Sequence, residues 1–134
     1  MKVKANFIKS KHGATSNGFQ SAAELTIWYL DQFLKQDGKC CYCETPISLI
    51  RKLIDANLLK TRTVGRTAQG RRGYRFEIER VDTENNVYEP ANCMLSCYYC
   101  NNDKSYIFPM DDYKKFLAPS RKHYFDYLLE KLKS

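Results

Sequence analysis

Two pairs of cysteines in this chain keep the spacing of metal-binding knuckles. Cys40 and Cys43 form the first pair, and Cys97 and Cys100 form the second. A tight turn between the members of each pair directs both thiolates at one ion, and two such turns complete the tetrahedral site of structural zinc. The interval between the pairs is wider than in a zinc ribbon, so four buried free thiols are the alternative. We expect a structural Zn²⁺ bound by these four cysteines.

The segment between the two pairs carries a carboxylate, an arginine, a tyrosine and amides in close succession. Glu79 and Arg80 end a strand-like run, and Tyr88 and Asn92 follow in the next loop. Asn101 comes directly after the second cysteine pair. These are the residue types that nuclease chemistry requires, because a phosphodiester must be held, polarised and attacked by a deprotonated water.

A basic stretch leads directly into this segment. It runs from Lys60 to Arg75, contains no acidic residue, and carries Arg62, Arg66, Arg71, Arg72 and Arg75. Such a stretch is often no more than a solvated, glycine-punctuated loop. Because it feeds into the candidate site, we expect it to bind the phosphates of a nucleic acid.

Composition sets the limits within which these groups act. The 134 residues contain 43% hydrophobic residues and no low-complexity tract, which favours one domain over residues 1–134. No apolar stretch has the length of a signal peptide or a membrane span, so we expect a cytoplasmic protein that does not bind a membrane. In that reducing compartment, cysteine pairs hold metal more often than they form disulfides. Cys41 and Cys93 are left over, and Cys93 is expected in the core. The net charge of +7 is a weak indication of a polyanionic partner.

Capping signals and hydrophobic periodicity predict the elements that position these residues. Ser21 and Glu24 form a capping box ahead of a helix that ends at Asp37-Gly38. The other expected elements are a helix within 46–60, strands at 74–81 and 93–96, a helix from 99 to 105, and closing helical segments from 111 to 133 interrupted at Pro119. The expected fold class is α+β.

Taken in order, these motifs resemble the HNH, or ββα-metal, endonuclease family. The family pattern is Asp-His at the end of a first strand, an Asn before a second strand, and Cys-x-x-Cys-Asn-x-x-Lys at the start of a helix. Glu79-Arg80, Asn92 and the run from Cys97 to Lys104 occupy those places here. The resemblance covers residues 40–108 and implies a small ββα core with a four-cysteine zinc site. Residues 1–39 and 109–134 would be helical flanks.

The resemblance implies a role for each matched residue. Glu79 and Asn101 would bind a catalytic Mg²⁺ or Mn²⁺ through oxygen, as such hard ions prefer. Asn92 would brace the loop by hydrogen bonds. Lys104 and the basic stretch would bind phosphates of double-stranded DNA. Glu77, which shares a strand face with Glu79, is a substitute or supporting ligand.

Arg80 departs from the family pattern, because the general-base His normally stands there and arginine stays protonated. A subgroup among rare-cutting restriction and phage-borne nucleases also has Arg at this place, followed by Tyr-x-Pro-x-Asn. This chain repeats that run as Tyr88 to Asn92. The resemblance implies that Tyr88 is the general base and that Arg80 favours its phenolate. The alternative is that Tyr88 only packs on the strand.

Two functions therefore remain open at the level of the sequence. The first is a metal-dependent HNH-type DNA endonuclease of restriction, homing or phage type, which leaves 5′-phosphate and 3′-hydroxyl ends. The second is a catalytically inactive, zinc-stabilised nucleic-acid-binding module derived from such a nuclease. Since one ββα site cuts one strand at a time, double-strand cleavage would need a homodimer or two sequential events.

Overall fold

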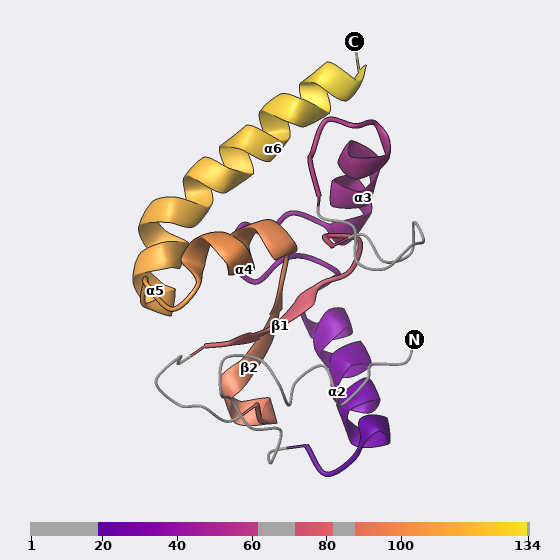
Figure 1. The fold of residues 1–134 in the computed structure, drawn as a ribbon, viewed down its shortest axis with the longest axis vertical. Helices are drawn as coiled ribbons and strands as arrows, with labels where there is room; N and C mark the ends of the chain where they lie inside the picture. The colour runs from indigo at the N-terminus through magenta and orange to yellow at the C-terminus, as the bar shows by residue number, and fades with distance from the viewer. Residues whose placement is uncertain (1–18, 62–71, 82–87, 134) are drawn as a thin grey trace.

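The structure is a computed structural model, and it describes residues 19–61, 72–81 and 88–133 (Figure 1). A short two-stranded sheet lies at the centre, with helices on its flanks. The elements are α2 (Ala22–Lys35), α3 (Ile47–Asp55), β1 (Glu77–Arg80), β2 (Cys93–Ser96), α4 (Tyr98–Lys104), α5 (Met110–Asp112) and α6 (Ala118–Lys133). A 3₁₀ turn over Pro90–Asn92 precedes β2, and a π-helical turn over Tyr113–Leu117 joins α5 to α6. None of the helices in these ranges is long and apolar enough to cross a bilayer.

Strands β1 and β2 form an antiparallel hairpin. Its register pairs Glu77 with Ser96 and Glu79 with Met94. Strand β2 has the predicted bounds, whereas β1 is shorter than the predicted 74–81, because the four residues of β2 offer partners to only four residues of β1. Side chains alternate along a strand, so Glu77 and Glu79 share one face and Arg80 lies on the other.

Helix α4 follows β2 directly and packs against β1, which completes a ββα unit. The Cys97 thiol caps its first turn by accepting a 3.3 Å hydrogen bond from the backbone of Cys100. The helix ends where Ser105 adopts a φ of 49°. The prediction of an α+β fold built on a small ββα core is confirmed.

Helix α2 begins at the predicted capping box. The Ser21 hydroxyl accepts a 3.1 Å hydrogen bond from the backbone of Glu24. The Glu24 carboxylate accepts from the backbone of Gln20 rather than from Ser21, one residue earlier than the motif requires. The helix ends at Lys35, and the chain turns at Asp37, whose φ of 55° lets the N–H of the next residue, Gly38, donate a 2.9 Å hydrogen bond to the Phe33 carbonyl.

Two other helices differ from prediction. Helix α3 ends at Asp55, because Asn57 takes a φ of +59° and the Leu58 N–H turns back to the Leu53 carbonyl. Pro119, by contrast, does not interrupt the closing helix. The preceding π-helical turn, in which the Ala118 N–H bonds to the Tyr113 carbonyl, widens the backbone and the helix continues.

Hydrophobic periodicity over 120–133 predicts a core face of Tyr124, Tyr127, Leu128 and Leu132, and the face of α6 that packs on the core differs from it. Phe125 and Leu128 are buried. Tyr124, Tyr127 and Leu132, which the periodicity places beside Leu128, are exposed. The core side of the helix is therefore rotated toward Phe125.

Candidate active site and zinc centre

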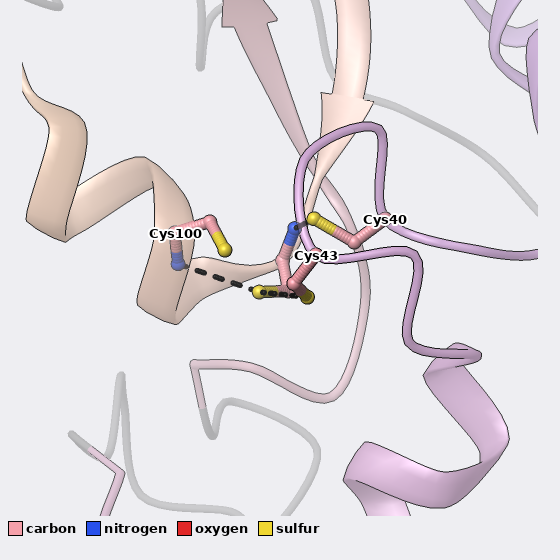
Figure 2. A group of neighbouring side chains, drawn as sticks. Cys40, Cys43 and Cys100 are labelled. Atoms are coloured by element: carbon pink, nitrogen blue, oxygen red, sulfur yellow. Dashed lines mark hydrogen bonds between the residues drawn. The ribbon is translucent and has the colours of Figure 1, made fainter. Parts of the chain in front are cut away.

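Four thiols meet in the interior of the protein. The Sγ atoms of Cys40, Cys43, Cys97 and Cys100 all lie within 4.8 Å of one another, and all four residues are buried. Cys40 and Cys43 come from the loop that leads into α3, and Cys100 comes from α4 (Figure 2). The Cys43 and Cys97 sulfurs are 3.9 Å apart. Tetrahedral zinc with Zn–S bonds of about 2.3 Å requires sulfurs about 3.8 Å apart, so the donor set and its spacing fit Zn²⁺.

Backbone N–H groups further support thiolates in this cluster. The Cys40 sulfur accepts hydrogen bonds from the N–H groups of Tyr42 at 3.4 Å and Cys97 at 3.3 Å. Burial alone would raise the pKa of the Cys40 thiol, but hydrogen bonds from the neighbouring thiols, that of Cys100 foremost, bring the pKa well below its ordinary value. The pKa is also lowered at Cys43 but raised at Cys97 and Cys100, so zinc binding would have to deprotonate the latter two thiols.

The remaining two cysteines lie outside this cluster, as predicted. The backbone N–H of Cys41 donates a 3.0 Å hydrogen bond to the Leu95 carbonyl, which ties the first knuckle to strand β2. Cys93 is buried in the core, where burial raises the pKa of its thiol to about 12. Its sulfur is not part of the four-cysteine group, so Cys93 is not placed to bind the same ion.

The carboxylate that Asn101 contacts is Glu77, not Glu79. The Asn101 side-chain amide donates a 2.7 Å hydrogen bond to Glu77 Oε1. Arg72 binds the other oxygen, Oε2, through Nη2 at 2.5 Å and Nε at 2.9 Å. The strand alternation that places Glu77 beside Glu79 indicated this residue in the sequence, but not that it would be the one facing Asn101.

Glu79 forms a buried ion pair with Lys104. The Lys104 ammonium lies 3.5 Å from Glu79 Oε1, and the two side chains are 1% exposed for Lys104 and 4% for Glu79. The same ammonium lies 6.0 Å from the centre of the Tyr42 ring. The predicted binding of a flanking phosphate by Lys104 requires an accessible ammonium, and the structure instead encloses Lys104 between β1 and the first knuckle. Lys104 thus neutralises a buried carboxylate, and its phosphate-binding role stays a prediction.

Arg80 and Tyr88 contact one another, as the proposed general-base arrangement requires. The guanidinium carbon of Arg80 lies 5.4 Å from the centre of the Tyr88 ring. Tyr88 is 3% exposed. Burial raises the pKa of its phenol above the ordinary value, and the charge and hydrogen bond of Arg80 offset only part of that rise. Arg80 lowers the pKa of Tyr88, as expected. Burial outweighs this effect, so the resulting pKa of Tyr88 lies above that of a free tyrosine.

Asn92 ends the 3₁₀ turn that leads into β2. Its backbone N–H donates a 2.9 Å hydrogen bond to the Glu89 carbonyl. Its own carbonyl accepts a 2.9 Å bond from the N–H of Val81 at the end of β1. These bonds close the two ends of the hairpin loop on each other. The bracing role proposed for the side chain of Asn92 stays a prediction.

The structure describes only the two ends of the basic stretch, residues 60–61 and 72–75. Arg62, Arg66 and Arg71 lie outside the described residues. Arg72 is engaged within the protein, since it binds Glu77 and its guanidinium lies 4.6 Å from the centre of the Tyr98 ring. Arg75 is exposed. Of the two arginines that are described, Arg75 is therefore the one placed to reach a phosphate.

Comparison with known proteins adds one finding. No family model matches the chain, and no curated protein matches it. A solved structure of the rare-cutting HNH restriction endonuclease PacI is similar, with a TM-score of 0.63 and 22% identity, covering 90% of this chain and 72% of that one. That structure is described as exhibiting a mechanism of DNA perturbation. The likeness shows that this chain has the fold of an HNH endonuclease, and the resemblance drawn from the motifs is confirmed at the level of the fold.

Proposed function

We propose that this protein is a metal-dependent endonuclease of the HNH type that hydrolyses DNA. The observation that carries the proposal is the contact between Glu77 of β1 and Asn101 of α4, with donor and acceptor 2.7 Å apart. This contact joins a carboxylate of β1 to an amide of α4, two elements of the ββα unit. Helix α4 also carries Cys100 of the zinc cluster. The PacI fold supports the same reading, because PacI is an HNH restriction endonuclease.

The oxygen donors on this face fit a divalent ion. Glu77 and Glu79 are two residues apart on one strand, and each has a cationic partner, Arg72 and Lys104 respectively. Two buried carboxylates that each pair with a cationic side chain are also suited to bind Mg²⁺ or Mn²⁺, which prefer oxygen ligands. We assign Glu79 and Asn101 as ligands, with Glu77 as a further ligand. When bound, such an ion polarises the scissile phosphate and stabilises the leaving 3′ oxygen.

Arg80 and Tyr88 complete the chemistry from the chain's own residues. The Tyr88 phenolate accepts a proton from water, the water oxygen forms a bond to phosphorus, and the bond from phosphorus to the 3′ oxygen breaks. The leaving 3′ oxygen takes a proton from solvent water, and the products are a 5′-phosphate and a 3′-hydroxyl. Arg80 cannot accept a proton, but its charge favours the phenolate and neutralises the phosphate. Asn92 holds the loop that carries Tyr88.

The substrate in this proposal is double-stranded DNA, and the setting is the cytoplasm, in restriction, homing or phage biology. The basic stretch would bind the DNA backbone, through Arg75 and through Arg62, Arg66 and Arg71. A homodimer would supply one site for each strand.

One observation favours a second candidate function. Tyr88 is buried and its pKa is raised, while Arg80 stands where the family base would stand. A chain without a working base would be a zinc-stabilised nucleic-acid-binding module that does not cleave.

Incubation of the purified protein with supercoiled plasmid separates the two candidates. The endonuclease should nick or linearise the plasmid with Mg²⁺ or Mn²⁺ and not with a chelator. An Asn101→Ala variant that still holds its zinc should bind DNA and not cleave it. DNA binding without cleavage by the wild-type protein under every metal condition would support the inactive module instead.

A further inference from the structure

Arg72 occupies a carboxylate that is assigned to the divalent ion. Its Nη2 and Nε atoms lie 2.5 and 2.9 Å from the same oxygen, Glu77 Oε2. A carboxylate oxygen has two lone pairs, so Arg72 uses the full acceptor capacity of Oε2. The second oxygen, Oε1, accepts the 2.7 Å hydrogen bond from Asn101. A divalent ion therefore cannot bind through Oε2, or through both oxygens, while Arg72 stays in place.

Arg72 also belongs to the basic stretch that is proposed to bind DNA. The Thr61 hydroxyl donates a hydrogen bond to the Arg72 carbonyl, so the two described ends of the stretch meet at this residue. This bond anchors the backbone of Arg72. A change of partner by the guanidinium therefore requires only rotation of the side chain.

The Arg72 guanidinium is held in place without being enclosed. Its side chain is 30% exposed, whereas that of Glu77 is 9% exposed. The guanidinium carbon lies 4.6 Å from the centre of the Tyr98 ring, which fixes the plane of the group. A phosphate accepts the same two-pronged hydrogen bond as a carboxylate, so it is an equivalent partner for this guanidinium.

We propose that Arg72 exchanges Glu77 for a backbone phosphate when DNA binds, and that this exchange opens Glu77 to the divalent ion. The inference rests on the proposed binding of DNA and of Mg²⁺ or Mn²⁺ at this site. In the free protein, Arg72 neutralises the carboxylate. In the complex, the ion neutralises Glu77 and Arg72 neutralises a phosphate, so that no buried charge loses its partner.

The exchange makes the binding of DNA and of the ion cooperative. Each ligand raises the affinity for the other, and linkage requires that both increases have the same factor. Arg72 is then a positioning residue for the ion, because it acts on the ion only through Glu77.

Isothermal titration calorimetry of Mn²⁺ into the zinc-loaded full chain, without DNA, tests the first half of the exchange. Arg72→Gln should raise the affinity for Mn²⁺ about tenfold, because the competing cation is gone. An arginine that only supported the fold would have the opposite effect or none. Arg75→Gln is the matched control, since it removes the same charge from the same stretch at an exposed position, and its Mn²⁺ affinity should stay close to that of the wild type.

Two further variants separate the exchange from a change in folding or in charge. Arg72→Lys keeps the charge beside Glu77 but not the two-pronged contact, so it should raise the Mn²⁺ affinity by a smaller factor. In a Glu77→Gln background, Arg72→Gln should bring no gain, because the carboxylate through which it acts is absent. Circular dichroism and zinc content establish that each variant is folded.

Fluorescence anisotropy of a labelled DNA duplex tests the second half of the exchange. The Tyr88→Phe background limits cleavage, and electrophoresis checks that the duplex stays intact. Mn²⁺ should tighten DNA binding, and adding Arg72→Gln should remove most of that increase. Adding Arg75→Gln should weaken binding with and without Mn²⁺ and keep the increase.

The outcomes distinguish this exchange from the proposed function. Folded Arg72→Gln and Arg72→Lys proteins that bind Mn²⁺ no more tightly than the wild type would overturn the exchange, even if the wild type cleaves DNA. A wild type that binds Mn²⁺ without cleaving would contradict the endonuclease, and a gain in Arg72→Gln would still support the exchange. A wild type that binds no Mn²⁺, with or without DNA, would overturn both.

Discussion

The side-chain amide of Asn101 donates a 2.7 Å hydrogen bond to the Glu77 carboxylate, and Arg72 binds the other oxygen of the same carboxylate at 2.5 Å. Helix α4, whose first turn belongs to the zinc cluster, is thereby joined to the first residue of β1. A change at Glu77 therefore acts on the position of Asn101 and on the orientation of Arg72 at once.

We predict that Glu77→Ala lowers the affinity for Mn²⁺ by about 10–100-fold, comparable to the loss in Asn101→Ala, because either change removes an oxygen donor or the group that orients it. Isothermal titration calorimetry of Mn²⁺ into the zinc-loaded protein measures the effect. Glu130→Ala, which removes an exposed carboxylate on α6, is the control. Unchanged Mn²⁺ affinity in Glu77→Ala would leave Glu79 and Asn101 as the only assigned ligands.

Zinc should be present at one ion per chain and should be required for the fold. Cys97→Ser removes one of four thiolates from a buried cluster, and zinc binding is coupled to folding, so the variant should lose its zinc and its cooperative thermal transition. Cys93→Ser is the matched control, because Cys93 is also buried but lies outside the cluster. Metal analysis and calorimetry check both. A folded Cys97→Ser protein without zinc would contradict a structural role for the metal.

Local signals in the sequence predicted much of this fold. Strand β2 and the start of α2 are set by neighbouring residues, and the cysteine spacing identified all four members of the cluster. The π-helical turn before Pro119 was not predictable, because it depends on how α6 packs against the core.

The sequence indicated which residues belong to the candidate site, but not which of them contact one another. Glu77 and Glu79 have the same side-chain chemistry and the same strand face. Which of them meets Asn101 depends on where α4 crosses β1, and no local signal carries that information. The burial of Lys104 has the same cause, since a lysine in the last turn of a short helix gives no sign of being enclosed.

Lys104→Met should destabilise the protein by about 3–5 kcal/mol, because it leaves the buried Glu79 carboxylate without its cation. The double variant Lys104→Met, Glu79→Gln should recover most of that loss, since neither remaining side chain is charged. Chemical denaturation of the zinc-loaded proteins measures both values. A phosphate-binding lysine would behave differently: its loss would weaken DNA binding and leave the free energy of unfolding unchanged.

Arg75→Ala should weaken binding to all DNA sequences alike and lower the salt dependence of binding by about one phosphate contact. Arg75 is exposed, so its side chain can reach the DNA backbone. Fluorescence anisotropy at several salt concentrations measures the slope. Lys122→Ala, an exposed cation on α6, serves as the control. Equal slopes for the wild type and Arg75→Ala would remove Arg75 from the DNA-binding surface.

The pH dependence of cleavage should report Tyr88. Its phenol pKa is raised by burial, so the phenolate is a small fraction at neutral pH and grows about tenfold with each unit of pH below the pKa. Single-turnover cleavage by the wild type should therefore rise with pH through and beyond the neutral range. Tyr88→Phe should slow cleavage by about 10²–10⁴ and remove this rise, while zinc content and DNA affinity stay unchanged.

Arg80→His tests the same general base by restoration, because it places an imidazole where the HNH family carries one. Added to Tyr88→Phe, it should restore part of the activity, and the restored rate should level off near the pKa of histidine, at about 6.5. The raised pKa of Tyr88 predicts no such plateau for the wild type. A Tyr88→Phe enzyme that cleaves at the wild-type rate with the wild-type pH profile would show that Tyr88 only packs on the strand, and the base would have to be sought elsewhere on the hairpin.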